Sequence, residues 1–160
     1  MSRITELEEK VKELMKEIKT LKQEKVEEFE YPFKRMEKYY FIDNDGKIIE
    51  SSWTNHNLDT CRYEQGNIFK TEKEALRERD KRTLLTRIRQ FCEKCNGGWK
   101  PTTHERKYYI LFNVEEHKLE SDWFSNFKTF ESFGVFKSKE VCDSAIKLFG
   151  DEIKRLYLEW

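Results

Sequence analysis

Six side chains in the first two thirds of the chain combine the groups that bind phosphorylated or nucleotide-like molecules. Arginine forks bind phosphate and carboxylate oxygens, aromatic rings stack on bases, and amides read base edges. Some of these side chains lie in the polar stretch 53–67, and the others lie on the Arg-rich stretch 77–89. We predict that the two stretches form one ligand pocket, with contacts from Trp53, Arg62, Tyr63, Asn67, Arg77 and Arg82.

Each part of this set also has an ordinary structural interpretation. The Arg-rich stretch contains Glu78 and Asp80, and such a helix face is commonly solvated and held by i,i+4 ion pairs. Trp53 recurs as Trp123 in a sequence repeat, and a Trp that recurs in this way is typical of a core. Both interpretations stay open at this point.

A pair of cysteines, Cys92 and Cys95, stands before two glycines and is similar to one knuckle of a zinc ribbon. A closed zinc site needs four ligands. His104 is a candidate third ligand and Cys61 or His56 a fourth, but the sequence has no second paired knuckle. We expect packed or spare thiols, with zinc binding and a redox pair as the alternatives, and we predict no metal and no cofactor.

Catalytic signatures are absent from the sequence. It contains no phosphate-binding loop, no dinucleotide-binding glycine pattern, no HExxH and no GxSxG. Its acidic residues fall in patterns typical of solvated surfaces. We therefore predict that the protein is not an enzyme.

The composition limits the classes of partner. The chain has 160 residues, 39% of them charged, and no formal net charge, so no global field steers it to nucleic acid or anionic lipid. No apolar stretch is long enough to span a membrane, and the N-terminus does not resemble a signal peptide. We expect a cytoplasmic protein with reduced thiols and no membrane partner.

The first 29 residues have the pattern of a coiled coil. Apolar residues are spaced 3-4-3-4-3, with β-branched residues at the a positions and Leu at d, which favours a parallel dimer. We predict an oligomerisation helix over 1–29 and a linker over 30–36, where Pro32 ends the helix. A trimer and a helix folded back on its own domain are the alternatives. The apolar positions are Ile4, Leu7, Val11, Leu14, Ile18 and Leu21.

The remaining residues, 37–160, repeat one plan. Lys38-Tyr39-Tyr40 matches Lys107-Tyr108-Tyr109, and Phe69-Lys70-Thr71 matches Phe136-Lys137-Ser138. Each unit has the pattern of a hairpin, a polar stretch, a short strand and a helix. We predict an α+β fold in which a coiled-coil helix precedes a duplicated ββ(β)α antiparallel domain, with units 37–98 and 107–160.

Local signals place the elements within the first unit and at the end of the second. Asp45-Gly46 indicates a hairpin turn, and we expect 54–65 to be a loop. Thr71 with Glu74 forms a capping box that opens a long helix. We expect Gly150 to end the helix that Ser138 opens.

Several segments together resemble a widespread group of small accessory proteins of phages and prophages of Firmicutes. They are KYYFIDNDGKIIESSW, GNIFKTEKEA, FCEKCNGGWKP, KYYILFN and FKSKEVCDSAIKLFGDEIKRLY, within roughly residues 37–160. The group typically lacks the Cys pair, which argues against a zinc role. Because the group has no assigned activity, the resemblance implies a context, the cytoplasm of an infected bacterium, rather than a mechanism.

From this context we expect a non-enzymatic, homo-oligomeric anti-defence protein that acts by binding. The first hypothesis is sequestration of a nucleotide-type immune signal, an anionic small molecule. The second is an anti-CRISPR-type inhibitor that binds a host defence nuclease. A nucleic-acid-binding regulator and a structural phage protein are further alternatives.

Overall fold

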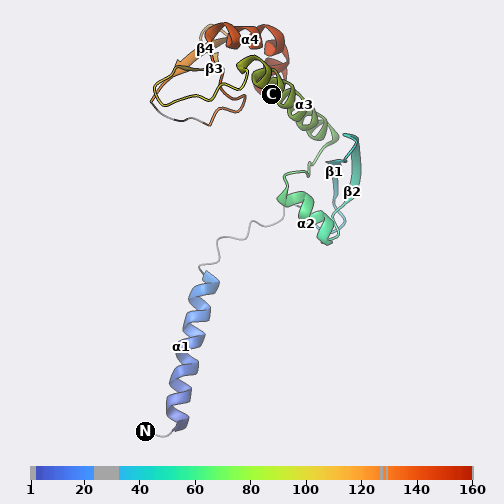
Figure 1. Ribbon diagram of the computed structural model, residues 1–160. Coiled ribbons are helices and arrows are strands. Elements are labelled where there is room, and N and C mark those ends of the chain that lie inside the picture. Colours follow the sequence, from blue (N-terminus) through green and yellow to red (C-terminus); the bar gives the residue numbers. More distant parts are fainter. Residues whose placement is uncertain (1–2, 24–32, 127, 129, 160) are drawn as a thin grey trace. The chain divides into compact units, whose positions relative to one another are not determined.

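The computed structural model describes residues 3–23, 33–126, 128 and 130–159. The chain forms two units, 1–34 and 35–160, and each is described by itself. The second unit is a mixed helix-and-sheet structure with two separate two-stranded antiparallel sheets, as an α+β fold predicts (Figure 1). No described helix is both long and apolar enough to cross a membrane.

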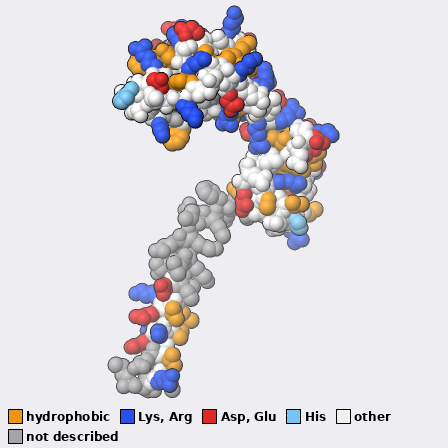
Figure 2. Space-filling model, viewed as in Figure 1, with side chains coloured by type: hydrophobic (Ala, Val, Ile, Leu, Met, Phe, Trp, Pro, Cys, Tyr) orange, Lys and Arg blue, Asp and Glu red, His pale blue; other side chains and the backbone are white. Residues whose placement is uncertain are grey.

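The first unit contains helix α1, Arg3–Gln23. Leu7, Val11 and Leu14 are all more than half exposed, and Figure 2 shows apolar side chains along one side of this helix. The other predicted apolar positions, Ile4, Ile18 and Leu21, have side chains that are not described. The last part of the predicted coil and the beginning of the predicted linker, including Pro32, lie outside the described residues.

The first hairpin pairs β1, Lys38–Ile42, with β2, Ile48–Ser52, and Tyr39 lies opposite Ser51. Gly46 has φ 77°, which the turn requires and glycine adopts without strain. The predicted third strand is reduced to a single bridge, in which Phe69 exchanges two backbone hydrogen bonds with Tyr40.

The prediction of a loop over 54–65 is wrong, because residues Asn57–Glu64 form helix α2. His56 caps this helix, and the Asp59 side chain accepts a hydrogen bond from the His56 backbone in return. Histidine is an uncommon cap and the helix is eight residues long, so neither a strong cap nor a sustained apolar period marked it in the sequence.

Helix α3, Glu72–Asn96, confirms the predicted capping box at Thr71 and ends at Gly97, which has φ 59°. It contacts both strands of the first hairpin as well as α4 and the C-terminal turn, so it links the first hairpin to the C-terminal helices (Figure 1). Its buried residues are Ala75, Leu84, Ile88 and Cys92.

The second hairpin pairs β3, Lys107–Asn113, with β4, Lys118–Phe124, and is followed by the bridge between Tyr108 and Phe136. Each hairpin is thus followed by one bridge and then by a capped helix. By the position of the bridge, Tyr40 in the first half is equivalent to Tyr108 in the second. By alignment of the repeated Lys-Tyr-Tyr sequence, Tyr40 is equivalent to Tyr109. The two backbones are therefore offset by one residue from the sequence alignment.

The last helix, α4, is Lys139–Ile153, capped by Ser138 as predicted. The expectation that Gly150 ends this helix is wrong, because α4 continues through it to the π-helical turn η1, Lys154–Leu158. A Cβ atom at Gly150 would lie 3.4 Å from Leu119 Cδ1. That distance is an ordinary van der Waals contact, so Gly150 lies where α4 packs against β4.

The main core lies between α3, α4 and the second hairpin. Leu84, Ile88, Phe136, Cys142 and Ala145 are fully buried in it. The T-shaped contact between Phe91 and Phe149, with ring centroids 5.8 Å apart, closes one side. The two-stranded sheet is covered in this way, as it must be, because an isolated hairpin is marginally stable in water.

Replacing Leu84 by Ala is expected to lower the free energy of unfolding by about 3 kcal/mol, through lost burial and the cavity left behind. Leu148 lies on α4 and is 60% exposed, so Leu148→Ala is the matched control and should change it by less than about 0.5 kcal/mol. Urea unfolding followed by circular dichroism measures both. Similar losses for the two variants would contradict the assignment of the core.

Candidate functional site

The predicted ligand residues do not form one pocket. Trp53, Arg62 and Tyr63 lie around α2 and the first hairpin. Asn67 and Arg82 meet at the connection between α2 and α3, and Arg77 lies against the C-terminal turn. Three local environments therefore have to be considered.

The first environment is built on Asp59, which is 4% exposed. One carboxylate oxygen accepts a hydrogen bond from the Tyr39 hydroxyl at 2.7 Å, and the other accepts from the Thr54 amide and hydroxyl at 2.8 Å each. Arg62 donates to the Tyr39 hydroxyl at 2.7 Å, and its guanidinium lies 3.6 Å from the centroid of the Phe41 ring. Arg62 is thus engaged within the chain, beside a buried carboxylate.

The aromatic members of the predicted set are engaged in a similar way. Trp53 is 1% exposed and makes edge-on contacts with Tyr39 and Tyr63, both with ring centroids 6.4 Å apart. Its indole N–H donates to the Asn55 side chain. A ligand base could not stack on Trp53 without moving these rings. Trp123, its counterpart by sequence, is 45% exposed and lies under the Arg106 guanidinium at 4.3 Å.

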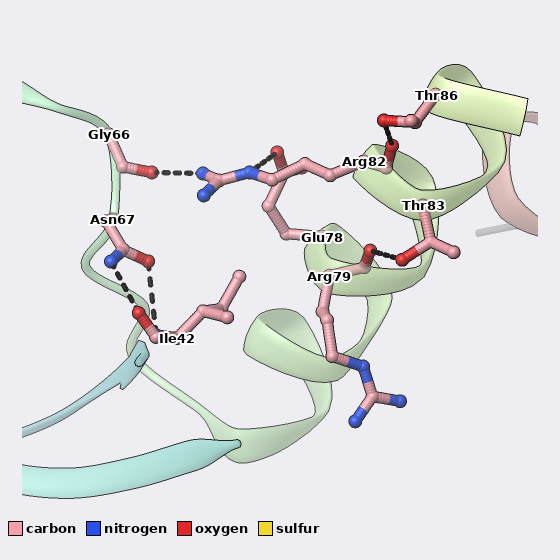
Figure 3. A network of polar contacts seen from close by, with 8 residues as sticks. All are labelled: Ile42, Gly66, Asn67, Glu78, Arg79, Arg82, Thr83 and Thr86. Atoms are coloured by element: carbon pink, nitrogen blue, oxygen red, sulfur yellow. Dashed lines mark hydrogen bonds and ion pairs between the residues drawn. The ribbon is translucent and has the colours of Figure 1, made fainter. Parts of the chain in front are cut away.

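The second environment is the connection between α2 and α3, shown in Figure 3. The Asn67 side chain accepts from the Ile42 amide at 3.1 Å and donates to the Ile42 carbonyl at 2.8 Å, so it extends the pairing of β1. Arg82 donates to the Gly66 carbonyl at 3.1 Å and to Glu78 at 2.9 Å. Asn67 and Arg82 therefore fasten this connection to β1 and α3.

The other cations of α3 follow the same pattern. Arg79 pairs with Asp80 at 2.8 Å, and Arg87 pairs with Glu152 at 2.8 Å. The ammonium of Lys81 lies 5.0 Å from the Tyr157 ring centroid. Most of the positive charge on this helix face is thus compensated by neighbours. This agrees with the interpretation of the Arg-rich stretch 77–89 as a solvated helix face held by ion pairs.

The third environment is a hollow of about 380 Å³ between the first turns of α3 and the C-terminal turn. Arg77 donates to the Leu156 carbonyl at 3.0 Å and to the Glu159 carbonyl, which fixes its guanidinium at the hollow. Lys73 and Arg155 line the same hollow, with Asp80, Glu159, Leu76 and Leu156. Arg155 is exposed and has no ion pair or hydrogen bond among residues 3–23, 33–126, 128 and 130–159.

The sequence prediction included Arg77 but missed Lys73 and Arg155. Arg155 stands about 80 positions further along the chain. The available signal was the Lys154-Arg155 pair between the apolar residues Ile153 and Leu156, and nothing in the sequence linked that pair to the start of α3.

Cys92, the first cysteine of the pair, is placed for packing. The Cys92 thiol donates to the Val135 carbonyl at 3.0 Å, and burial raises the pKa of this thiol. Burial also raises the pKa of Cys142 to about 12. Thiols of this kind stay protonated at neutral pH and are poor metal ligands or nucleophiles. Within the described part of the chain, no cluster of three or more His, Cys, Asp or Glu is placed to hold a metal ion.

Comparison with known proteins gives no relative for this chain: no family model, no curated protein and no solved structure matches it.

The Asp59 cluster predicts a loss of stability in acid. Burial alone would raise the pKa of Asp59, but hydrogen bonds from Tyr39, Thr54 and His56 outweigh burial and lower it. An unfolded Asp has a pKa of about 3.9. The carboxylate therefore contributes its full stability above that value, and the contribution is lost as the pH falls through the lower pKa of the folded chain.

We expect Asp59→Asn to lower the free energy of unfolding by about 2 kcal/mol at pH 7, because one of the charged acceptor oxygens becomes an amide donor. This difference from the parent protein should shrink when the pH is lowered below about 4. Urea midpoints measured at both pH values test this, with Asp45→Asn, at an exposed turn, as the control. A difference that stays constant with pH would contradict the role of the carboxylate.

Proposed function

We propose that the protein is a non-catalytic binding protein that sequesters a small anionic ligand of the nucleotide type. The observation that carries this proposal is the hollow lined by Lys73, Arg77 and Arg155. Its volume of about 380 Å³ falls in the range of small-molecule sites, about 300–1,000 Å³.

The electrostatics of the hollow favour an anion. Three cations line it against two acids, and one of these acids, Asp80, is paired with Arg79. Arg77 is held by the Leu156 carbonyl, which orients its guanidinium in advance. The hollow also lies at the first turns of α3, where the helix dipole adds positive potential.

The resemblance to phage accessory proteins supplies the biological setting of the proposal. In an infected bacterium, a nucleotide-type immune signal has the phosphates that Arg and Lys bind and circulates at low concentration, so a stoichiometric binder could remove it. We propose this setting, with the bacterial cytoplasm as the location, as part of the same hypothesis.

We propose in addition that the protein self-associates through α1. The supporting observation is the exposed stripe Leu7, Val11 and Leu14, which has the 3-4 spacing of a coiled-coil seam and no apolar cover within the described unit. A parallel dimer is the simplest product, since Val occupies an a position and Leu the d positions.

We also propose that the two halves of the larger unit derive from a duplication. The shared order of hairpin, single bridge and capped helix supports this, together with the repeated letters.

Arg155→Gln should weaken binding of the ligand about tenfold, because a charge-assisted hydrogen bond contributes about 1.5 kcal/mol or more. Calorimetry with a panel of cyclic nucleotides and cyclic ADP-ribose isomers identifies the ligand and measures the loss. Arg89→Gln removes an equal charge from an exposed position of α3 outside this hollow and should leave the affinity unchanged. No heat with any member of the panel would reject the nucleotide proposal.

Val11→Glu combined with Leu14→Glu should convert the protein to monomers, because charges at a and d positions disrupt the seam. Light scattering coupled to gel filtration reports the molar mass. Lys12→Gln with Lys16→Gln changes the net charge by the same amount on the polar face and should leave the oligomer intact. A parent protein that is already monomeric would overturn the self-association proposal and leave the ligand proposal standing.

A further inference from the structure

A second hollow, of about 440 Å³, lies at the base of the second hairpin, in a different part of the larger unit from the α3 hollow. Phe124 and Val135 provide apolar walls, and Thr102, Thr103 and Asn126 provide polar ones. Two lysines, Lys107 and Lys128, also line it, and no acidic side chain among the described residues does. A hollow of this size accommodates a small molecule.

Lys107 is buried, with 6% of its surface exposed. Its ammonium donates to the Glu105 carbonyl at 3.1 Å and to the Thr103 carbonyl at 3.4 Å, and lies 5.6 Å from the Phe124 ring centroid. An ammonium has three N–H donors, so two carbonyls leave one donor for another acceptor. A buried charge is costly unless an opposite charge compensates it.

No acid within the described residues forms an ion pair with Lys107. The nearest candidate is Glu105, whose carboxylate instead accepts a hydrogen bond from the Thr102 amide at 2.7 Å. Hydrogen bonds from Thr102 lower the pKa of Glu105, and the charge of Lys107 contributes to the same shift. Glu105 thus remains ionised and directed at the backbone of the loop.

The first half of the unit shows what occupies the equivalent place there. By the bridge register, Tyr39 precedes Tyr40 as Lys107 precedes Tyr108, and both Tyr39 and Lys107 are buried. The Tyr39 hydroxyl donates to the carboxylate of Asp59, which helix α2 supplies.

The second half has no such helix. Between β4 and Val135, the described residues 125, 126, 128 and 130–134 form none, and the space beside Lys107 is hollow. In the first half a carboxylate from the chain therefore accepts a hydrogen bond from the buried donor. In the second half the corresponding donor carries a positive charge, and no carboxylate of the described residues accepts a hydrogen bond from it.

We propose that this hollow binds a small molecule that carries one acidic group on an apolar body. A carboxylate or phosphate oxygen of the ligand accepts a hydrogen bond from the Lys107 ammonium, in the role that Asp59 has for Tyr39. Lys128 adds attraction at the rim, and the apolar body contacts Phe124 and Val135. This site is independent of the α3 hollow, so either can exist without the other.

Benzoate, phenyl phosphate and neutral benzyl alcohol are suitable probes, because they share a ring and differ in the acidic group. Titration followed by calorimetry and by amide NMR shifts should show that at least one anion binds saturably and tighter than the alcohol. The backbone amides of Thr103 and Asn126 should shift with it. The preferred anion distinguishes a carboxylate ligand from a phosphate ligand.

Lys107→Met keeps the length of the side chain and removes its charge. It should weaken anion binding at least tenfold and leave the weak binding of benzyl alcohol unchanged. Lys118→Met is the matched control, since Lys118 lies on the same hairpin but pairs with Glu116 and with Glu120, the latter at 2.8 Å. It should bind the anion as the parent does.

Two results overturn the proposal: equal affinity of the parent and Lys107→Met for both anions, or no saturable binding of either anion by the parent at millimolar concentration. Should Lys107→Met fail to fold, the parent decides the question, because the bound anion must raise its melting temperature while benzyl alcohol does not. Asn126→Ala, at the rim, should then weaken anion binding severalfold; unchanged binding in that variant also counts against the site.

Discussion

Neither of the two sheets can bury a face by itself, and the rest of the larger unit depends on how this constraint is met. Each sheet has two strands, and such a ribbon needs a third element against it to be stable. Helix α3 contacts the first hairpin as well as α4 and the C-terminal turn. One helix of 25 residues thereby covers both halves, so the packing of one half fixes the position of the other.

The two halves solve the burial problem with different chemistry. The second half packs against α3 in an apolar core, where Leu84 and Ile88 of that helix and Phe136 are fully buried. Between its hairpin and α2, the first half buries Tyr39, Trp53 and the carboxylate of Asp59. A buried carboxylate needs several donors, and these hold α2 in place. Arg62 donates to the hydroxyl of Tyr39, which in turn donates to Asp59, so Arg62 also stabilises the fold of this half.

How far the sequence predicts the structure depends on how local each signal is. The hairpin turn at Gly46 and the capping box at Thr71 are set within a few residues, and the structure contains both. Helix α2 was missed because its stability comes from contacts of Asp59 with residues such as Tyr39, 20 positions away. Gly150 does not end α4, and it lies where this helix packs against β4, a contact that the neighbouring sequence does not indicate.

The candidate sites were predicted less well, for a related reason. A cation is useful for binding when its neighbours leave its charge uncompensated, and the neighbours of a side chain are a property of the fold. The Arg-rich letters of α3 marked charges that mostly pair within the chain. No sequence motif distinguishes Arg155 or Lys107 as a binding residue. In the sequence, Lys107 looks like an ordinary residue at the start of a strand.

The offset of one residue between the two halves has a practical consequence for engineering. Successive side chains of a strand point to opposite faces of the sheet. A chimera that exchanged strands according to the repeated Lys-Tyr-Tyr sequence would therefore place each transplanted side chain on the opposite face of the sheet from the one it occupies in its own hairpin. Transplants between the halves have to be aligned on the two bridges, by which Tyr39 and Lys107 occupy equivalent positions in the two hairpins.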